Sequence, residues 1–253
     1  MTRHSPFFAL RLAATEAEKA AAQALRHQVF VEELGAMGGR LSDPCAGIEA
    51  DEFDAHCEHL LLLDSMRGEA VIGTTRVMTQ EGAARAGRFA SEAEFDLSAL
   101  RRSGRRLLEV GRTCLHPDHR GGAAMHRLWQ GLAALVEERG VELLFGLASF
   151  PGTDSDAVAE PLACLQRDHL APGEIRPRSL KPVPLSPRPA RDADRRTAML
   201  ATPALVKAYL RLGGKVGEGA FLDREFGCID VCMVLHTAML SERSRAIYAE
   251  RRR

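Results

Sequence analysis

Two charged residues lie inside an otherwise apolar segment, Leu107 to Leu115, and they are the side chains best placed to do chemistry. Burying an unpaired Glu109 or Arg112 there would cost several kcal/mol, so each needs a partner or a ligand. A carboxylate in an apolar strand can have its pKa raised toward neutrality, which suits a general base. We therefore take Glu109 as the candidate base, acting directly or through water. A structural ion pair between Glu109 and Arg112 is the alternative.

The spacing of these two charges also predicts an irregular strand. Residues three apart on a regular strand face opposite ways, so Glu109 and Arg112 share a site only if a bulge lies near Gly111. The strand leads through Pro117 and two glycines into an amphipathic helix predicted over 123–138. Backbone N–H groups at such a helix start favour phosphate.

Other polar candidates have plain structural alternatives. Arg26 and Phe30 lie four apart on a predicted helix, so Phe30 is either core or acyl-pocket lining. Asp51 and Asp54 fall in a turn-rich stretch, where Asp often caps. Arg76 follows a glycine within a strand, which fits a close approach to a ligand or an ordinary bulge.

Metal and cysteine chemistry have weaker support. His56, Cys57 and His59 would alternate between two faces of a strand, and no fourth ligand is indicated, so we expect no metal. Cys114 has His116 nearby in sequence but no third group to orient it, which favours a core thiol over a nucleophile.

Helical and strand periodicities predict an α/β fold in one domain, residues 1–253. A capping box at Thr15 and Glu18 begins the first helix, Pro161 falls within the third, and Thr202 caps the fourth. The proline-rich stretch 172–195 is an irregular loop within this domain. Helices are predicted over 15–34, 123–138, 155–169 and 202–212 and from Ser241, and strands over 57–64, 70–79, 105–115, 141–150 and 228–236.

Composition narrows the range of partners. The 253 residues contain 34 Lys plus Arg and 34 Asp plus Glu, so nothing favours nucleic acid as a partner. The start lacks a secretory pattern, and no apolar run approaches the roughly 20 residues that span a bilayer, so we expect a cytoplasmic protein. Its six scattered cysteines suit a reducing compartment. Arginines at 101, 102, 105 and 106 form a basic cluster that suits either an acidic carrier protein or plain solvation.

Four motifs in sequence order, at 26–30, 51–54, 73–76 and 109–112, make the chain similar to two related groups of enzymes. These are the acyl-homoserine-lactone synthases and the ornithine acyl-carrier-protein (ACP) N-acyltransferases, both of the Gcn5-related N-acetyltransferase (GNAT) superfold. Segments 53–63, 111–120 and 203–213, with Asp223, Phe226 and Asp230, resemble the ornithine group. The resemblance covers roughly residues 20 to 236. It implies a GNAT-type mixed central sheet flanked by helices.

The implied reaction moves a 3-hydroxyacyl group from ACP to the α-amine of L-ornithine, giving lyso-ornithine lipid. The acyl group travels on the phosphopantetheine of ACP, and no further cofactor is implied. Ala123 and Met125 stand where acetyl-CoA-dependent relatives usually have glycine or a small residue, which fits a donor with one phosphate. Alternatives are acyl-homoserine-lactone synthesis and a non-catalytic module that binds acyl carrier. Because the product is apolar, we expect transient contact with the surface of the inner membrane, as a peripheral membrane protein makes.

The resemblance also distributes roles among the candidate residues. Glu109 and Arg112 are catalytic, with backbone N–H groups around Cys114 and Leu115 supporting the oxyanion. Arg112 or Arg76 binds the substrate carboxylate. The remaining substrate-binding candidates are Arg26, Phe30, Asp51 and Asp54, and the donor-binding candidates are His116, Arg120, Gly121 and Gly122.

Overall fold

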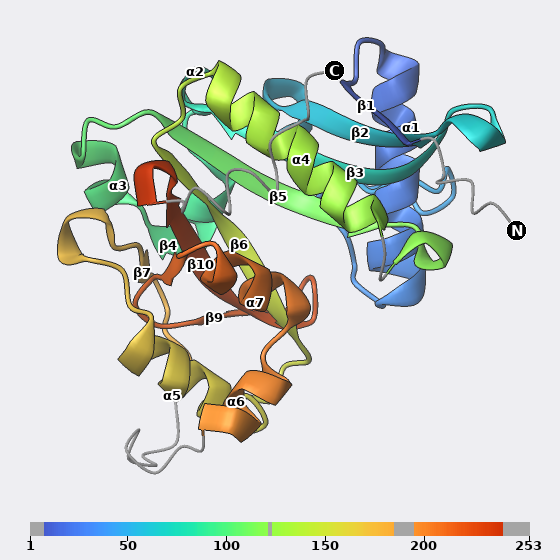
Figure 1. The fold of residues 1–253 in the computed structure, drawn as a ribbon. Coiled ribbons are helices and arrows are strands. Elements are labelled where there is room, and N and C mark those ends of the chain that lie inside the picture. The colour runs from blue at the N-terminus through green and yellow to red at the C-terminus, as the bar shows by residue number, and fades with distance from the viewer. Residues whose placement is uncertain (1–7, 121–122, 185–194, 240–253) are drawn as a thin grey trace, which may run out of the picture. The chain divides into compact units, whose positions relative to one another are not determined.

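The computed structural model describes residues 8–120, 123–184 and 195–239, which divide into two compact units (Figure 1). Of these residues, the first unit takes 8–86 and 110–139, and the second takes 87–109 and 140–239. Both are mixed α/β, with mostly antiparallel strand pairs and flanking helices, as predicted. The single domain over residues 1–253 stays a prediction.

The first unit is built on four strands hydrogen-bonded in the order β1, β2, β3, β5. The predicted hairpin of β2 and β3 is confirmed, and β1 is an addition at one edge. The bounds are β1 (Phe8–Leu12), β2 (Glu58–Asp64), β3 (Ala70–Thr79) and β5 (Leu107–Leu115), with only residues 110–115 of β5 in this unit. Helices α1 (Glu16–Arg26), α2 (Gln80–Ala86) and α4 (Ala123–Glu138) and short turns η2 (Asp54–His56), η3 (Ser65–Arg67) and η5 (Pro117–His119) complete it.

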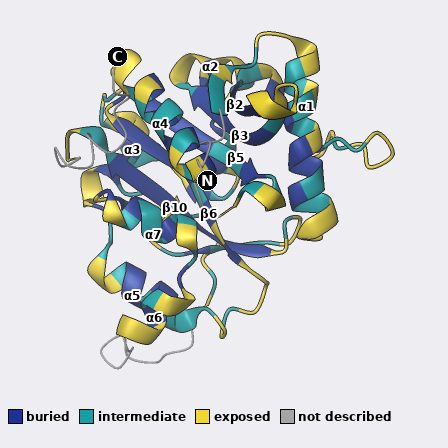
Figure 2. Ribbon diagram, turned by 45° about the vertical axis from the view of Figure 1, so that its right-hand side comes forward, coloured by how far each residue is buried: buried dark blue, intermediate teal, exposed yellow. Residues whose placement is uncertain are grey.

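Helices pack on both faces of these strands, so β2 is almost entirely buried (Figure 2). Leu61 and Leu63 form a core cluster with Ala22 of α1. On the other face, Gly131 of α4 lies so close to Leu60 that a Cβ there would come within 3.2 Å of the leucine side chain. This packing explains the apolar run in β2, which would alternate if only one face were covered.

The first predicted helix begins as expected and then changes type. Thr15 and Glu18 form the capping box, with the Glu18 N–H donating to Thr15 Oγ1 at 3.2 Å. The α-helix ends at Arg26, and a π-helix, η1 (His27–Glu33), continues to the predicted end. π-helical turns are rare and often occur at functional sites.

The second unit pairs β6 with β10 in antiparallel register along nine residues, from Leu143↔His236 to Pro151↔Cys228. β5 joins β6 in parallel through Leu107, Leu108 and Glu109. The strands are β4 (Phe95–Asp96), β6 (Leu143–Pro151), β7 (Arg178–Ser179), β8 (Lys215–Val216), β9 (Phe221–Asp223) and β10 (Cys228–His236). The helices are α3 (Ser98–Arg102), α5 (Ala159–Asp168), α6 (Arg195–Ala201) and α7 (Ala204–Arg211), with turns η4 (Ala90–Ala93), η6 (Gly173–Ile175) and η7 (Thr237–Met239).

Two helix starts in this unit differ from the predictions. The helix predicted from residue 155 begins at Ala159, so Pro161 lies in its first turn, where its missing N–H removes no helical bond. α7 starts after Pro203 and not after Thr202, whose hydroxyl instead donates to Ala198 O of α6 at 2.8 Å. Residues 185–194 of the proline-rich stretch and the tail helix from Ser241 lie outside the described residues.

Candidate active site

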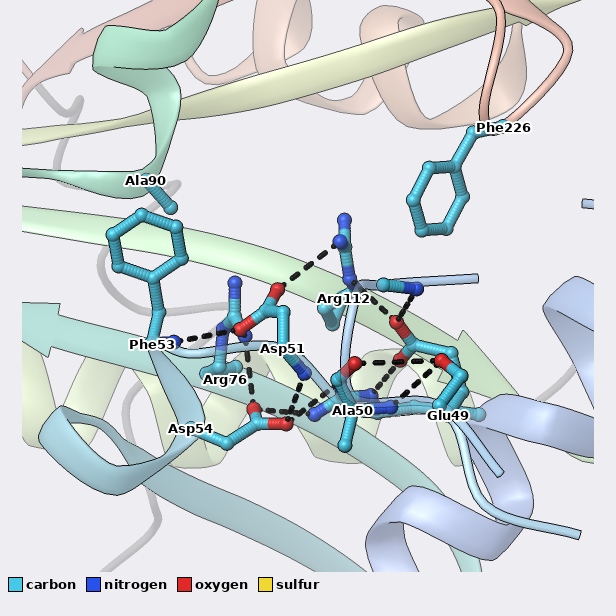
Figure 3. A network of polar contacts seen from close by, with 12 residues as sticks. Glu49, Ala50, Asp51, Phe53, Asp54, Arg76, Ala90, Arg112 and Phe226 are labelled. Atoms are coloured by element: carbon cyan, nitrogen blue, oxygen red, sulfur yellow. Dashed lines mark hydrogen bonds and ion pairs between the residues drawn. The ribbon is translucent and has the colours of Figure 1, made fainter. Parts of the chain in front are cut away.

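A group of buried and half-buried charges in the first unit brings together five of the predicted site residues and one that the sequence did not reveal. Figure 3 shows Glu49, Asp51, Asp54, Arg76 and Arg112 of this group. We call this group the arginine–carboxylate network. It consists of three cations, Arg26, Arg76 and Arg112, and three anions, Glu49, Asp51 and Asp54. Its formal charges therefore balance.

Arg26 and Arg76 meet at one carboxylate. Arg26 donates to Asp54 through both terminal nitrogens, at 2.7 and 3.1 Å, and its Nε donates to Glu49. Arg76 donates to the same Asp54 at 2.8 Å and also to Asp51. Paired guanidinium bonds of this kind are strong and fix geometry, so these side chains form a rigid assembly.

Arg112 differs from the other five members in exposure and backbone. Its side chain is 24% exposed, whereas those of the other five are at most 8% exposed. Its Nε lies 3.3 Å from Glu49 Oε1, and its Nη2 donates to Asp51 at 3.2 Å. Its φ of +50° is in the left-handed region, which is costly for a residue other than glycine. The irregularity predicted near Gly111 therefore falls on Arg112 itself.

Asp54 and Asp51 stay ionised because ion pairing outweighs burial. Burial alone would raise the pKa of Asp54, but Arg26 and Arg76 hold that pKa well below its usual range. Arg76 and Arg112 lower the pKa of Asp51 against the same effect of burial. Beneath them, burial lowers the pKa of His59 to about 4, so this ring is neutral although its Nε2 lies 3.8 Å from Asp54.

The two aspartates also shape the turn that carries them. Asp51 Oδ1 accepts the Phe53 N–H at 2.9 Å, and Asp54 Oδ2 accepts the Asp51 N–H at 3.2 Å. Asp51 and Asp54 therefore both stabilise the turn and take part in ion pairs. Glu49 was missed, although a charge count contained a signal: three candidate arginines with only two aspartates leave one positive charge that a third anion would balance.

Cys114 lies in the core, and the half-buried Phe30 packs against it. Cys114 forms a buried cluster with Leu25 and Val29, and Phe30 of η1 packs against it. Burial raises the pKa of Cys114 to about 12, which disfavours the thiolate that a nucleophile needs. These contacts agree with the interpretation of Cys114 as a core thiol.

Glu109 lies in the second unit and is held by three donors from one turn. Its Oε2 accepts the Ala90 N–H at 2.9 Å, and its Oε1 accepts the Ser91 N–H at 2.7 Å together with the Ser91 hydroxyl. The two N–H groups belong to the start of η4. The side chain of Glu109 is buried, but its surroundings are more polar than the apolar strand suggested.

The predicted donor-binding residues have protein partners. Arg120 forms a two-pronged pair with Glu33 of η1, with Nη2 to Oε2 at 2.6 Å, and its Nε donates to Leu115 O at 3.2 Å. The ring Nε2 of His116 lies 3.2 Å from the side-chain amide nitrogen, Nε2, of Gln28. Gly121 and Gly122 lie outside the described residues.

Curated relatives decide the family. A relative named "L-ornithine N(alpha)-acyltransferase" from Rhodobacter capsulatus is 49% identical over 248 residues, covering 96% of this chain and 95% of the relative. One of the same name from Rhizobium meliloti is 39% identical, covering 92% and 81%. This chain belongs to the L-ornithine N(alpha)-acyltransferase family. A family model described as an acetyltransferase (GNAT) domain also matches residues 25–130 of this chain.

Solved structures with the same fold are distant from this ornithine acyltransferase family member in sequence. An N-acyl amino acid synthase from uncultured soil microbes aligns with a TM-score of 0.54 at 13% identity, covering 92% of each chain. A CoA-dependent acyl-homoserine lactone synthase, solved with SAM and isopentyl-CoA, aligns with a TM-score of 0.57 at 13% identity, covering 96% of this chain and 88% of that one. The predicted GNAT-type fold is confirmed.

Proposed function

We propose that this chain transfers a 3-hydroxyacyl group from ACP to the α-amine of L-ornithine and so makes lyso-ornithine lipid. The observation that carries the proposal is 49% identity over nearly the full length to a relative named for ornithine acylation. In the reaction, the amine nitrogen attacks the thioester carbonyl, a C–N bond forms and the C–S bond breaks. The proton lost by the amine passes to a base and then to the departing pantetheine thiolate.

Arg112 is our proposed site for the ornithine carboxylate. A guanidinium can hold a carboxylate with two parallel hydrogen bonds, and Arg112 is the most exposed cation of the network. Asp51 and Glu49 contact Arg112 directly, and Asp54 braces Asp51 through Arg76. We therefore assign Arg26, Asp54 and the other buried members to holding Arg112 in place, a more limited role than direct substrate binding.

Glu109 is our proposed general base, working directly or through a water. The backbone N–H groups around Cys114 and Leu115 are proposed to stabilise the oxyanion, which requires donors fixed before the charge develops. His116 and Arg120 are proposed to contact the single phosphate of the carrier, and Arg120 would then exchange Glu33 for that phosphate. No metal or further cofactor enters this scheme.

The proposed location is the cytoplasm, with brief contact at the inner membrane surface when the apolar product leaves. Among residues 8–120, 123–184 and 195–239, none of the helices combines the length and the apolar character needed to cross a bilayer. A vesicle sedimentation assay that finds no binding, with or without product, would remove the membrane part of the proposal.

Mass spectrometry of products tests the reaction. Purified protein is incubated with 3-hydroxyacyl-ACP or the matching acyl-CoA, and with a panel of amines containing ornithine, lysine and S-adenosylmethionine. We expect an N-acyl ornithine product with the ACP donor. Acyl transfer to none of the amines would contradict the proposal, and a homoserine lactone with methylthioadenosine would identify a synthase of the related group.

A further inference from the structure

We infer that Ser91 is a positioning residue that holds the Glu109 carboxylate ionised and oriented for the transfer reaction; this inference rests on the proposed function. Ser91 is 1% exposed and donates twice to Glu109 Oε1, through its N–H and its hydroxyl. The sequence gives no sign of this contact, because the two residues are 18 positions apart.

The arrangement divides the three donors into two kinds. The N–H groups of Ala90 and Ser91 are fixed by the backbone of η4, which any residue other than proline would supply. The hydroxyl of Ser91 can be removed by a side-chain substitution that leaves the two backbone donors of the turn in place. Hydrogen bonds to the charged form of a carboxylate favour that form. Ser91 therefore adjusts the basicity of Glu109, while the turn fixes its place.

The turn itself is anchored by packing, so the donors do not move freely. Phe89, just before η4, meets Phe145 of β6 edge-to-face at 5.0 Å between ring centroids, and Arg101 of α3 lies over the Phe89 ring at 5.0 Å. Arg101 also pairs with Glu92, the third residue of η4. A serine on a turn clamped from two sides presents its hydroxyl in one direction.

Other titratable groups of the second unit act on Glu109 and must be held constant in a test. Arg101 of α3 favours the negative charge of Glu109. Cys232 of β10 is a neutral thiol, because burial and then the charges of Glu109 and Glu94 raise its pKa well above the usual value. None of these groups is altered by a substitution at Ser91.

Titration of the Glu109 side-chain carboxyl carbon by NMR, assigned by its loss in Glu109→Gln, tests the inference directly. In Ser91→Ala we expect the titration midpoint to rise by about one pH unit, because a hydrogen bond to a charged group is lost. Ser91→Thr keeps a hydroxyl and should stay near the wild-type midpoint. Ser98→Ala is the matched control, since Ser98 donates to the exposed Asp96 carboxylate and not to Glu109.

The pH profile of kcat for ornithine acylation gives the second readout. The acid limb should move to higher pH in Ser91→Ala by the same interval as the NMR midpoint, and stay in place in Ser98→Ala. An unshifted NMR midpoint in a folded Ser91→Ala protein would overturn the inference. A shifted midpoint with an unshifted kcat profile would overturn the positioning role in catalysis, while ornithine acylation itself, seen by mass spectrometry, would still stand.

Discussion

The strand β5 carries two charged residues, Glu109 and Arg112, and the two units accommodate them in opposite ways. In the first unit, Arg112 is balanced by full charges on Glu49 and Asp51, which are themselves tied to two more arginines. In the second unit, Glu109 accepts hydrogen bonds from two N–H groups and a hydroxyl of one turn. Buried ion pairs that share their partners form a rigid support, and removing one partner costs much stability. The hydrogen bonds to the Glu109 carboxylate can instead be removed one donor at a time.

The largest expected effect concerns Glu109. Glu109→Gln keeps the shape of the side chain and removes its charge, so kcat for ornithine acylation should fall by about 100- to 10,000-fold. Single-turnover kinetics with 3-hydroxyacyl-ACP would measure it. Glu58→Gln, at a part-exposed pair with Arg139, is the control and should keep its rate. Nearly full activity in Glu109→Gln would rule out this residue as the base.

Removing a member of the arginine–carboxylate network should lower the free energy of unfolding more than removing a hydrogen-bond donor to Glu109. Asp54→Ala leaves Arg26 and Arg76 short of a buried partner, so the free energy of unfolding should fall by about 3–5 kcal/mol. Denaturant unfolding would measure this loss, with Ser91→Ala expected to lose only about 1–3 kcal/mol. Equal losses of unfolding free energy in the two variants would contradict the distinction between the rigid network and the hydrogen bonds to Glu109.

The lowered pKa of His59, which lies next to Asp54, leads to a prediction about how stability depends on pH. Its pKa is lowered by burial from 6.5 to about 4, so the unfolded chain binds the proton more readily between these values. Stability is therefore fully present above pH 6.5 and falls as the pH drops toward 4, by at most about 1.4 kcal/mol per pH unit. His59→Leu should flatten this part of the stability curve. The exposed His126→Gln should leave it unchanged, and an unchanged curve in both variants would contradict a buried neutral His59.

The sequence predicted features that depend on neighbours along the chain. The capping box at Thr15 and the strand over 228–236 follow from local composition and alternation, and both were confirmed. The π-helix after Arg26 was not predicted, because its period differs from the α-helix only slightly over seven residues. The start of α5 was misplaced because the rule against proline in helices does not apply in the first turn.

The candidate site shows the same limit in another form. The family resemblance, together with the residue types, selected Arg26, Asp51, Asp54, Arg76 and Arg112, and all five lie in one network. Glu49 and Ser91 escaped notice because their importance comes from contacts across 23 and 18 positions of the chain. Charge balance points to the need for Glu49, but no local pattern points to the hydroxyl of Ser91.

The most direct test of the central claim compares ornithine with putrescine, which lacks the α-carboxylate, in wild type and Arg112→Gln. The measured quantity is the ratio of the two kcat/KM values, which does not depend on the folded fraction of either protein. Wild type should prefer ornithine, and Arg112→Gln should lose about 10- to 100-fold of that preference, the value of a charged hydrogen-bonded contact. An unchanged ratio would contradict the assignment of Arg112 to the ornithine carboxylate.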